Sequence, residues 1–246
     1  MDLGIQGKKA AVAAASTGLG FGCARALIED GVEVAICSRG EERIREAAAE
    51  LGAGAVPVVA DMSTEEGARS FIEQASEKLG HVDILVANAG GPPPGSPAST
   101  SIDGYREAID LNLLSTIVMC QAALPGMRER GWGRIVAITS IGARQPIGNL
   151  AASSVARAGV SSFLKTLSAE VARDGVTVNS AQPGIHATDR IKSLGNTDVV
   201  AQRVPTGTLG TAEDFGKAVA FLCSEPARFI TGTSILLDGG AYQGLI

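Results

Sequence analysis

A glycine-rich turn lies between the first apolar run of the chain and the first segment with a helical pattern. It contains Ser16, Thr17, Gly18, Leu19 and Gly20. Glycines at such a turn let backbone N–H groups and the positive end of a helix approach a pyrophosphate. Glycine spacing alone is weak evidence, because such a turn can be purely structural. The place of this turn, between a strand pattern and a helix pattern, favours a dinucleotide site.

The end of the second apolar run carries residues that would select the dinucleotide. Ser38 and Arg39 follow Cys37, and the first acidic residue is Glu41. An acid at this place would accept hydrogen bonds from an adenosine ribose, whereas an arginine would pair with a 2′-phosphate. We therefore predict NADP(H), with Ser38 and Arg39 as phosphate ligands. The alternative is that Arg39 is a solvated loop cation.

Alternating strand and helix patterns supply the framework for these residues. Short apolar runs predict strands over residues 9–14, 32–37, 56–60, 83–89, 134–139, 176–181 and 234–238. Helices are predicted between them, among them 64–79, 103–130, 149–173 and 212–223, and irregular chain over 184–210. Ser63 and Glu66 have capping-box spacing at the start of the first of these helices. The alternation predicts one α/β domain over 1–246, a doubly wound Rossmann-type fold with a mostly parallel seven-stranded sheet. Ligands of such sheets bind beyond the carboxyl ends of the strands.

The composition favours a soluble protein that acts on a small molecule. Apolar residues make up 45% of the chain and aromatic residues only 4%, so Ala, Val, Ile and Leu must build the core. The net charge is −5, with scattered basic residues, which argues against nucleic acid or acidic lipid as a partner. The four cysteines are far apart and predict reduced core thiols and no metal site. Without a leader pattern or an apolar run of about 18 residues, we expect a cytoplasmic protein with no membrane span.

The glycine-rich turn resembles that of the short-chain dehydrogenase/reductase family. The family carries T-G-x-x-x-G-x-G here, and Gly18 and Gly20 match its last two glycines. Ala13 and Ala14 stand where Thr and Gly are usual. The resemblance extends along the whole chain and is of the 3-oxoacyl-carrier-protein reductase type.

Four further segments match the family in the same order. Asn88, Ala89 and Gly90 resemble its N-A-G segment, and Asp61 with Met62 lies where the family contacts the adenine. The other two segments are a P-G-x-x-x-T loop beside the nicotinamide and the closing D-G-G, matched by Pro183, Gly184, Thr188 and Asp238–Gly240. This set implies an NADP(H) site.

The resemblance also implies where catalytic residues should lie. The family reduces carbonyls with an Asn, a Ser, a Tyr and a Lys. Asn112 and Ser140 match the first two. The Tyr-x-x-x-Lys pair should begin thirteen residues after Ser140, where this chain has Ser153 and Arg157. An aliphatic hydroxyl is a far weaker acid than a phenol of pKa about 10, and arginine keeps its charge but cannot shuttle protons.

Two other residues could take over the missing role. His186 lies in the predicted nicotinamide loop, and its imidazole would be a competent proton donor. Arg144 could stabilise an alkoxide or bind an acidic group of the substrate. For each residue, a structural role in its loop is the alternative. His186 is the first candidate, and Ser153 acting through a water held by Arg157 is the second.

Three functions remain open on this basis. The first is an NADP(H)-dependent oxidoreductase that reduces a ketone or oxoacyl group of a small-molecule carbonyl or alcohol substrate. The second is a nucleotide-binding or sensor protein without turnover. The third is non-redox chemistry as in halohydrin dehalogenases, which use Arg in place of Lys but keep the Tyr and lose the cofactor glycines.

Substrate contact and assembly are also implied. The segment 185–210 is expected to cover the substrate, although it carries no transferable motif. The helices that hold Asn112 and Arg157 form the usual subunit contact of the family, so the resemblance implies a homotetramer. Small and apolar residues on these helices suit close packing between subunits: Ala122, Ala158, Gly159 and Phe163.

Overall fold

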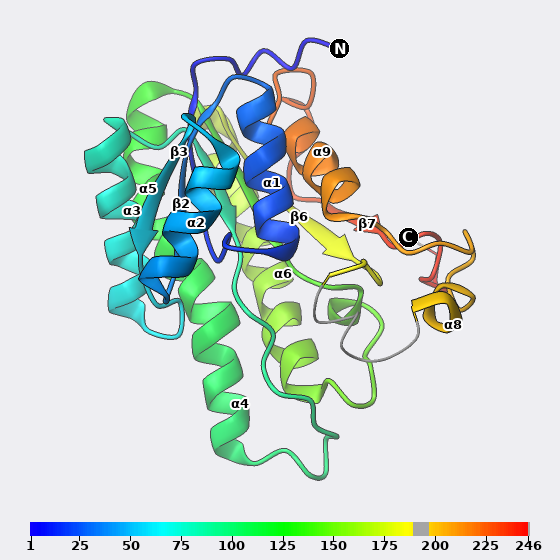
Figure 1. The fold of residues 1–246 in the computed structure, drawn as a ribbon. Coiled ribbons are helices and arrows are strands. Elements are labelled where there is room, and N and C mark those ends of the chain that lie inside the picture. The colour runs from blue at the N-terminus through cyan, green and yellow to red at the C-terminus, as the bar shows by residue number, and fades with distance from the viewer. Residues whose placement is uncertain (189–196, 246) are drawn as a thin grey trace.

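Seven parallel strands form one sheet at the centre of the molecule (Figure 1). The computed structural model describes residues 1–188 and 197–245. The strand order is β3-β2-β1-β4-β5-β6-β7. The strands are β1 (Lys9–Val12), β2 (Glu33–Ser38), β3 (Ala55–Val59), β4 (Ile84–Ala87), β5 (Gly133–Ile138), β6 (Val176–Pro183) and β7 (Ser234–Leu237). The predicted doubly wound fold is confirmed, and every strand pair is parallel, where the prediction was a mostly parallel sheet.

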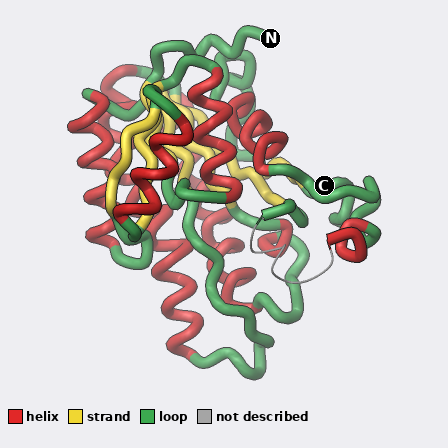
Figure 2. Tube along the Cα trace, in the orientation of Figure 1, coloured by secondary structure: helices red, strands yellow, loops and turns green. Residues whose placement is uncertain are grey.

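Helices cover both faces of the sheet, as Figures 1 and 2 show. One face carries α1 (Gly18–Glu29), α2 (Glu41–Leu51) and α9 (Ala212–Leu222). The other face carries α3 (Glu65–Leu79), α5 (Ser115–Arg130) and α6 (Ala151–Val171). Two shorter helices are α4 (Ile102–Ala108), which projects at the bottom of Figure 1, and α8 (Thr197–Ala201).

Two aliphatic cores fill the spaces between the sheet and its helix layers. Leu27, Ile44 and Val219 are fully buried in the core beneath α1, α2 and α9. Phe71 and Met119 are fully buried in the core beneath α3, α5 and α6. Both faces of each central strand are therefore covered, which accounts for the continuous apolar runs of the sequence.

The backbones of α1 and α9 touch at a pair of glycines. A Cβ atom on Gly216 would lie 2.1 Å from the carbonyl oxygen of Gly22, and one on Gly22 would lie 2.0 Å from the carbonyl oxygen of Ala212. Both distances are far below van der Waals contact. Only glycine allows the two helices to pack this closely.

The predicted helix over 103–130 is present as one uninterrupted helical stretch, Ile102–Arg130, but it is not α-helical throughout. A π-helical segment, Ile109–Leu114, separates α4 from α5 and contains Asn112. By length and apolar composition the stretch Ile102–Arg130 could cross a membrane, but Met119, Cys120 and Met127 are fully buried against the sheet. The apolar character of this stretch is therefore that of a core helix.

Two local predictions were wrong. The capping residue of α3 is Thr64, whose side chain accepts a hydrogen bond from Gly67 N, and not Ser63. Both residue types can cap a helix, so spacing alone did not decide between them. The segment predicted to be irregular over 184–210 contains α8, and residues 189–196 lie outside the described part of the chain.

Candidate cofactor and active site

The turn before α1 has the geometry of an anion site. Thr17 precedes α1 in an extended conformation, and its side chain makes no capping hydrogen bond. The first N–H groups of α1 thus remain open to a ligand. Gly18 has a φ of +63°, and a Cβ on Gly20 would lie 2.7 Å from the Ala14 carbonyl oxygen and 2.9 Å from Asn88 Nδ2. Both glycines are therefore required by the turn itself.

Ala14 has a φ of +47°, in the left-handed region that favours glycine. This is the position at which the family motif has Gly. Two hydrogen bonds hold the residue there: Asn88 Nδ2 donates to its carbonyl oxygen at 3.2 Å, and its N–H donates to Cys37 Sγ at 3.4 Å. Asn88 thereby fastens the end of β4 to the glycine-rich turn.

A cavity of about 280 Å³ lies beside this turn, between the ends of β2, β3 and β4. Its lining includes six of the residues predicted to bind cofactor, together with Cys37: Ser16, Ser38, Arg39, Asp61, Met62 and Gly90. Arg43 also lines it, from the first turn of α2. Arg43 was not predicted to be a site residue, although it follows Arg39 by only four positions. Arg39 and Arg43 place two positive charges on one cavity.

The P-G-x-x-x-T loop packs against both the turn and the last strand. Thr188 Cγ2 lies 3.7 Å from the place of a Gly18 Cβ, so Thr188 is beside the start of α1. A Cβ on Gly184 would lie 2.7 Å from Asp238 Cα, so the loop also touches the D-G-G segment. Pro183 ends β6 and positions the loop at the carboxyl edge of the sheet.

Arg157 joins Ser153 to the carboxyl end of β5, directly before Ser140. Arg157 Nη1 donates to the carbonyl oxygens of Ile138 and Thr139, both at 2.9 Å. Arg157 Nε donates to Ser153 Oγ at 3.3 Å, and Ser140 Oγ accepts from Gly142 N at 2.9 Å. Each serine hydroxyl thus accepts a hydrogen bond from an N–H group and keeps its own hydrogen for a further acceptor.

Asn112 connects the π-helical segment to the cofactor loop. Its Nδ2 donates to the Gly90 carbonyl oxygen at 2.9 Å, while its Oδ1 is buried without a partner. The segment adjoins α6, because a Cβ on Gly159 would lie 2.9 Å from Leu113 Cδ2. A single-turn π-helix at such a place is typical of functional sites.

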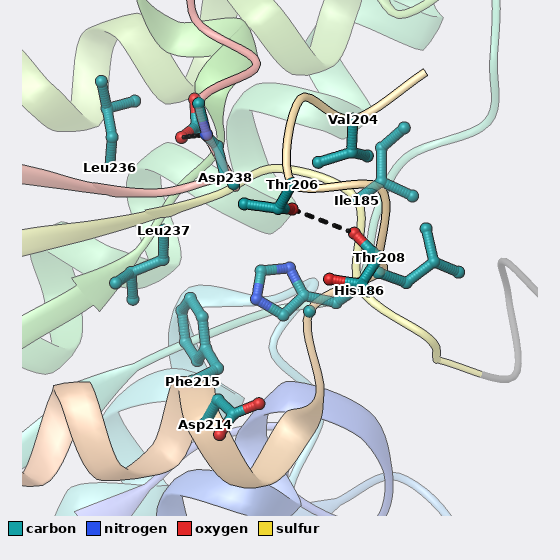
Figure 3. A pocket seen from close by; sticks show the side chains of 14 residues that line it. Ile185, His186, Val204, Thr206, Thr208, Asp214, Phe215, Leu236, Leu237 and Asp238 are labelled. Carbon is teal, nitrogen blue, oxygen red and sulfur yellow. Dashed lines mark hydrogen bonds between the residues drawn. The ribbon is translucent and has the colours of Figure 1, made fainter. Parts of the chain in front are cut away.

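His186 lies in a different cavity from these residues. Its ring is buried and packs edge-on against Phe215, with ring centroids 5.2 Å apart (Figure 3). The cavity measures about 440 Å³ and is lined by Asp214 and Asp238 among others, but not by Asn112 or by the residues at the end of β5. Burial lowers the pKa of the His186 imidazole from 6.5, so the ring is neutral at pH 7.

Arg144 is held by the backbone of the last strand. Its Nη2 donates to the Ser234 carbonyl oxygen at 3.0 Å. This bond ties the loop after Ser140 to β7. The position supports the structural alternative for Arg144.

The cysteines are free and buried, and the described residues contain no group of three or more His, Cys, Asp or Glu that could hold a metal ion. Burial raises the pKa values of the Cys37, Cys120 and Cys223 thiols to about 12. The thiols are therefore protonated at neutral pH and unreactive.

Comparison with known proteins identifies the family. Residues 13–242 match the model of a family described as Enoyl-(Acyl carrier protein) reductase. The 3-oxoacyl-[acyl-carrier-protein] reductase FabG of Escherichia coli is 32% identical over 244 residues, which cover 98% of this chain and 100% of that protein. L-fucose dehydrogenase of Bos taurus is 34% identical over 253 residues, which cover 97% of this chain and 90% of that protein.

Solved structures of reductases are also similar. L-sorbose reductase from Gluconobacter frateurii, complexed with NADPH and L-sorbose, has a TM-score of 0.95 and 30% identity, with all of both chains covered. YwfH, an NADPH-dependent reductase involved in bacilysin biosynthesis, has a TM-score of 0.92 and 26% identity over 97% of this chain and 99% of that one. Together with the sheet order and the site geometry, these likenesses show that the chain belongs to the short-chain dehydrogenase/reductase family.

Proposed function

We propose that this protein is an NADP(H)-dependent oxidoreductase that reduces the carbonyl of a ketone or oxoacyl substrate. The observation that carries the proposal is the cavity beside the start of α1. Ser38, Arg39 and Arg43 line it where an NAD-type site would have an acid at the end of β2. The similar L-sorbose reductase is a complex with NADPH and YwfH is an NADPH-dependent reductase, which supports the same cofactor here.

The residues present fit a bound NADP(H). Gly18 and Gly20 allow the turn that leaves the first N–H groups of α1 open to a pyrophosphate, and nothing lies within 4 Å of a Cβ placed on Gly90. Arg39 and Arg43 would pair with the 2′-phosphate. The remaining residues that would hold the cofactor are Ser16, Thr17, Leu19, Ser38, Asp61, Met62, Asn88, Ala89, Pro183, Gly184 and Thr188. When bound, the cofactor supplies the hydride.

The proton donor is the unusual part of the proposal. Ser153 and Arg157 stand at the positions of the family Tyr and Lys. Of the two candidate donors, the geometry favours Ser153, because Arg157 bonds it and also the backbone directly before Ser140, while His186 lines another cavity. Arg157 orients the Ser153 hydroxyl and stabilises negative charge on the substrate oxygen, and a water completes the proton transfer.

A protein that binds NADP(H) without turnover is the second candidate. The observation that favours it is again Ser153 and Arg157, since a serine and an arginine stand where the family has its catalytic Tyr and Lys. Such a protein would keep the cavity around Arg39 and lose the catalytic rate. A rate of NADPH oxidation separates the two functions.

The setting of the enzyme is part of the proposal. We expect a cytoplasmic homotetramer that contacts a small-molecule substrate through the segment 185–210. Residues 189–196 of that segment lie outside the described part of the chain.

Cofactor titration and a substrate screen test the proposed function. NADPH should bind at least about tenfold more tightly than NADH, because a phosphate–arginine pair contributes about 1–3 kcal/mol. Arg39→Ala should remove most of that preference in a fluorescence titration. Arg45→Ala is the control, because Arg45 pairs with Glu41 and does not line the cavity. Equal affinities in the unmodified protein would refute the cofactor, and no NADPH oxidation over ketones, quinones and oxoacyl thioesters would favour the second candidate.

A further inference from the structure

Gln182 is a buried residue whose side-chain amide has no hydrogen-bond partner. Its exposed fraction is 0%, and neither Nε2 nor Oε1 is bonded. Nearly all buried polar groups in folded proteins are paired, because an unpaired one destabilises the fold. A partner from outside the protein, such as a water molecule, would satisfy the Gln182 amide.

The alternation of residues along β6 shows which way Gln182 faces. Val178 belongs to the core beneath α5 and α6, and Ala181 belongs to the core on the opposite face. Ser180 Oγ lies 2.6 Å from Thr139 Oγ1, on the same side as Val178. Gln182 comes two residues after Ser180, so its side chain also faces α6.

The pairing of β6 with β5 shows how far along the sheet Gln182 lies. Ala181 pairs with Ile138, and its carbonyl oxygen accepts a hydrogen bond from Thr139 N at 2.9 Å. Gln182 is therefore level with Thr139, the residue before Ser140. Arg157 donates to the carbonyl oxygens of Ile138 and Thr139 at this same level. Gln182 thus lies at the level of the two carbonyl groups that Arg157 binds, one residue from Ser140.

Two more unpaired polar atoms belong to the same end of the molecule. Ser154 Oγ is buried without a partner, and so is Asn112 Oδ1. The place of a Gly142 Cβ is 3.3 Å from Ser154 Oγ and 3.2 Å from Ser140 Oγ, so the two hydroxyls flank one turn. Among the described residues, the remaining atom of this kind is Thr177 Oγ1, near the opposite end of β6.

We propose that Gln182 is a further site residue whose amide binds a hydroxyl group beside Ser140 and Ser154. A hydroxyl fits because it can accept from Nε2 and donate to Oε1 at once. The hydroxyl comes either from a water molecule that links the serines or from the substrate itself. The inference rests on the proposed function, because it places the hydroxyl next to the carbonyl that is reduced.

Gln182→Met tests the proposal, because methionine has a similar length and no amide. The assay measures kcat and KM with NADPH and two substrates, a ketone and the matching α-hydroxy ketone. If water supplies the hydroxyl, kcat falls at least about tenfold for both substrates while KM stays within about twofold. If the substrate supplies it, KM for the hydroxy ketone alone rises at least about tenfold. Thr177→Val, which removes an unpaired hydroxyl far from the site, should change neither parameter.

A crystal structure of the unmodified protein gives a second readout that needs no turnover. The proposal expects an oxygen atom within hydrogen-bond distance of both Gln182 Nε2 and Oε1. If the oxygen belongs to water, it is present in crystals without substrate. If it belongs to the substrate, it appears only in crystals that contain substrate. An amide bonded only to protein atoms, or to nothing, overturns the proposal, as does a Gln182→Met enzyme with unchanged kcat and KM. If Gln182→Met does not fold, Gln182→Ala removes the amide with a smaller, uncharged side chain. If no carbonyl is reduced at all, the proposed function fails and the crystal structure still decides on Gln182.

Discussion

Ser153 and Arg157 form the pair on which the proposed proton transfer depends. We expect Ser153→Ala and Arg157→Met each to lower kcat by about 10² to 10⁴, the usual contribution of a proton donor, with NADPH affinity nearly unchanged. His186→Asn should change kcat by less than about threefold, because the ring lines a separate cavity. Steady-state kinetics of the three variants check this. The opposite pattern, with His186→Asn severe and Ser153→Ala mild, would make His186 the donor.

His186 should make the free energy of unfolding depend on pH. Burial lowers the folded-state pKa of its imidazole below 6.5, so the unfolded chain takes up the proton first as the pH falls. The contribution of His186 to the free energy of unfolding is therefore complete above about pH 6.5, the ordinary pKa of the unfolded chain, and is lost as the pH falls toward the folded-state pKa. Denaturant unfolding between about pH 5 and pH 8 should show this slope, and His186→Asn should reduce it. A slope that is the same in both proteins would contradict the assignment.

The residue types of the site could be predicted, but not the directions of their side chains. Ser38, Arg39 and Asp61 were found from their places at strand ends, because strand ends are visible in the sequence as the limits of apolar runs. The direction of the His186 ring could not be predicted: it packs against Phe215 and lines a cavity apart from Ser153 and Arg157. Gln182 was missed because a glutamine at a strand end gives no sign of being buried. Side-chain direction depends on tertiary contacts that no local pattern contains.

The contact between α1 and α9 is sensitive to a single methyl group. Gly216→Ala would gain helix propensity, yet its Cβ would stand 2.1 Å from the Gly22 carbonyl oxygen. We expect the free energy of unfolding to fall by at least about 1–3 kcal/mol, since the helices must separate. Gly104→Ala in α4 is the matched control, because its Cβ would approach only side-chain atoms at 3.3 and 3.4 Å. Equal unfolding midpoints for the two variants would show that α9 can move away from α1 without lowering the free energy of unfolding.

The elements themselves could be predicted because apolar runs and helical patterns alternate throughout the chain. The strand boundaries agree to within a few residues, as for β2 at Glu33–Ser38. The π-helical segment Ile109–Leu114 could not be predicted, since one extra residue in a turn leaves the apolar pattern almost unchanged. That segment sets the position of Asn112, so the part of the fold missed in the sequence is also a part of the site.

Assembly is the prediction that concerns the whole molecule. Ile102 and Val155 are 66% and 53% exposed on α4 and α6, which supports a subunit contact at this surface. Gly159, in contrast, packs inside the chain against Leu113. Light scattering at micromolar concentration should give four times the 25.0-kDa chain mass, and Val155→Asp should lower that mass. A monomer mass for the unmodified protein would refute the tetramer.

The four buried thiols make the two layers of the molecule separately observable. Cys23 and Cys223 lie in the core beneath α1, α2 and α9, and Cys37 and Cys120 lie in the core on the other face of the sheet. A thiol reagent reaches Cys23, Cys120 and Cys223 only when the helix layer above them opens, whereas Cys37 also lines the cavity beside α1. Labelling Cys120 therefore counts openings of one layer, and labelling Cys23 or Cys223 counts openings of the other layer. Thiol labelling of the unmodified protein thus reports which helix layer opens more often when no dinucleotide is bound.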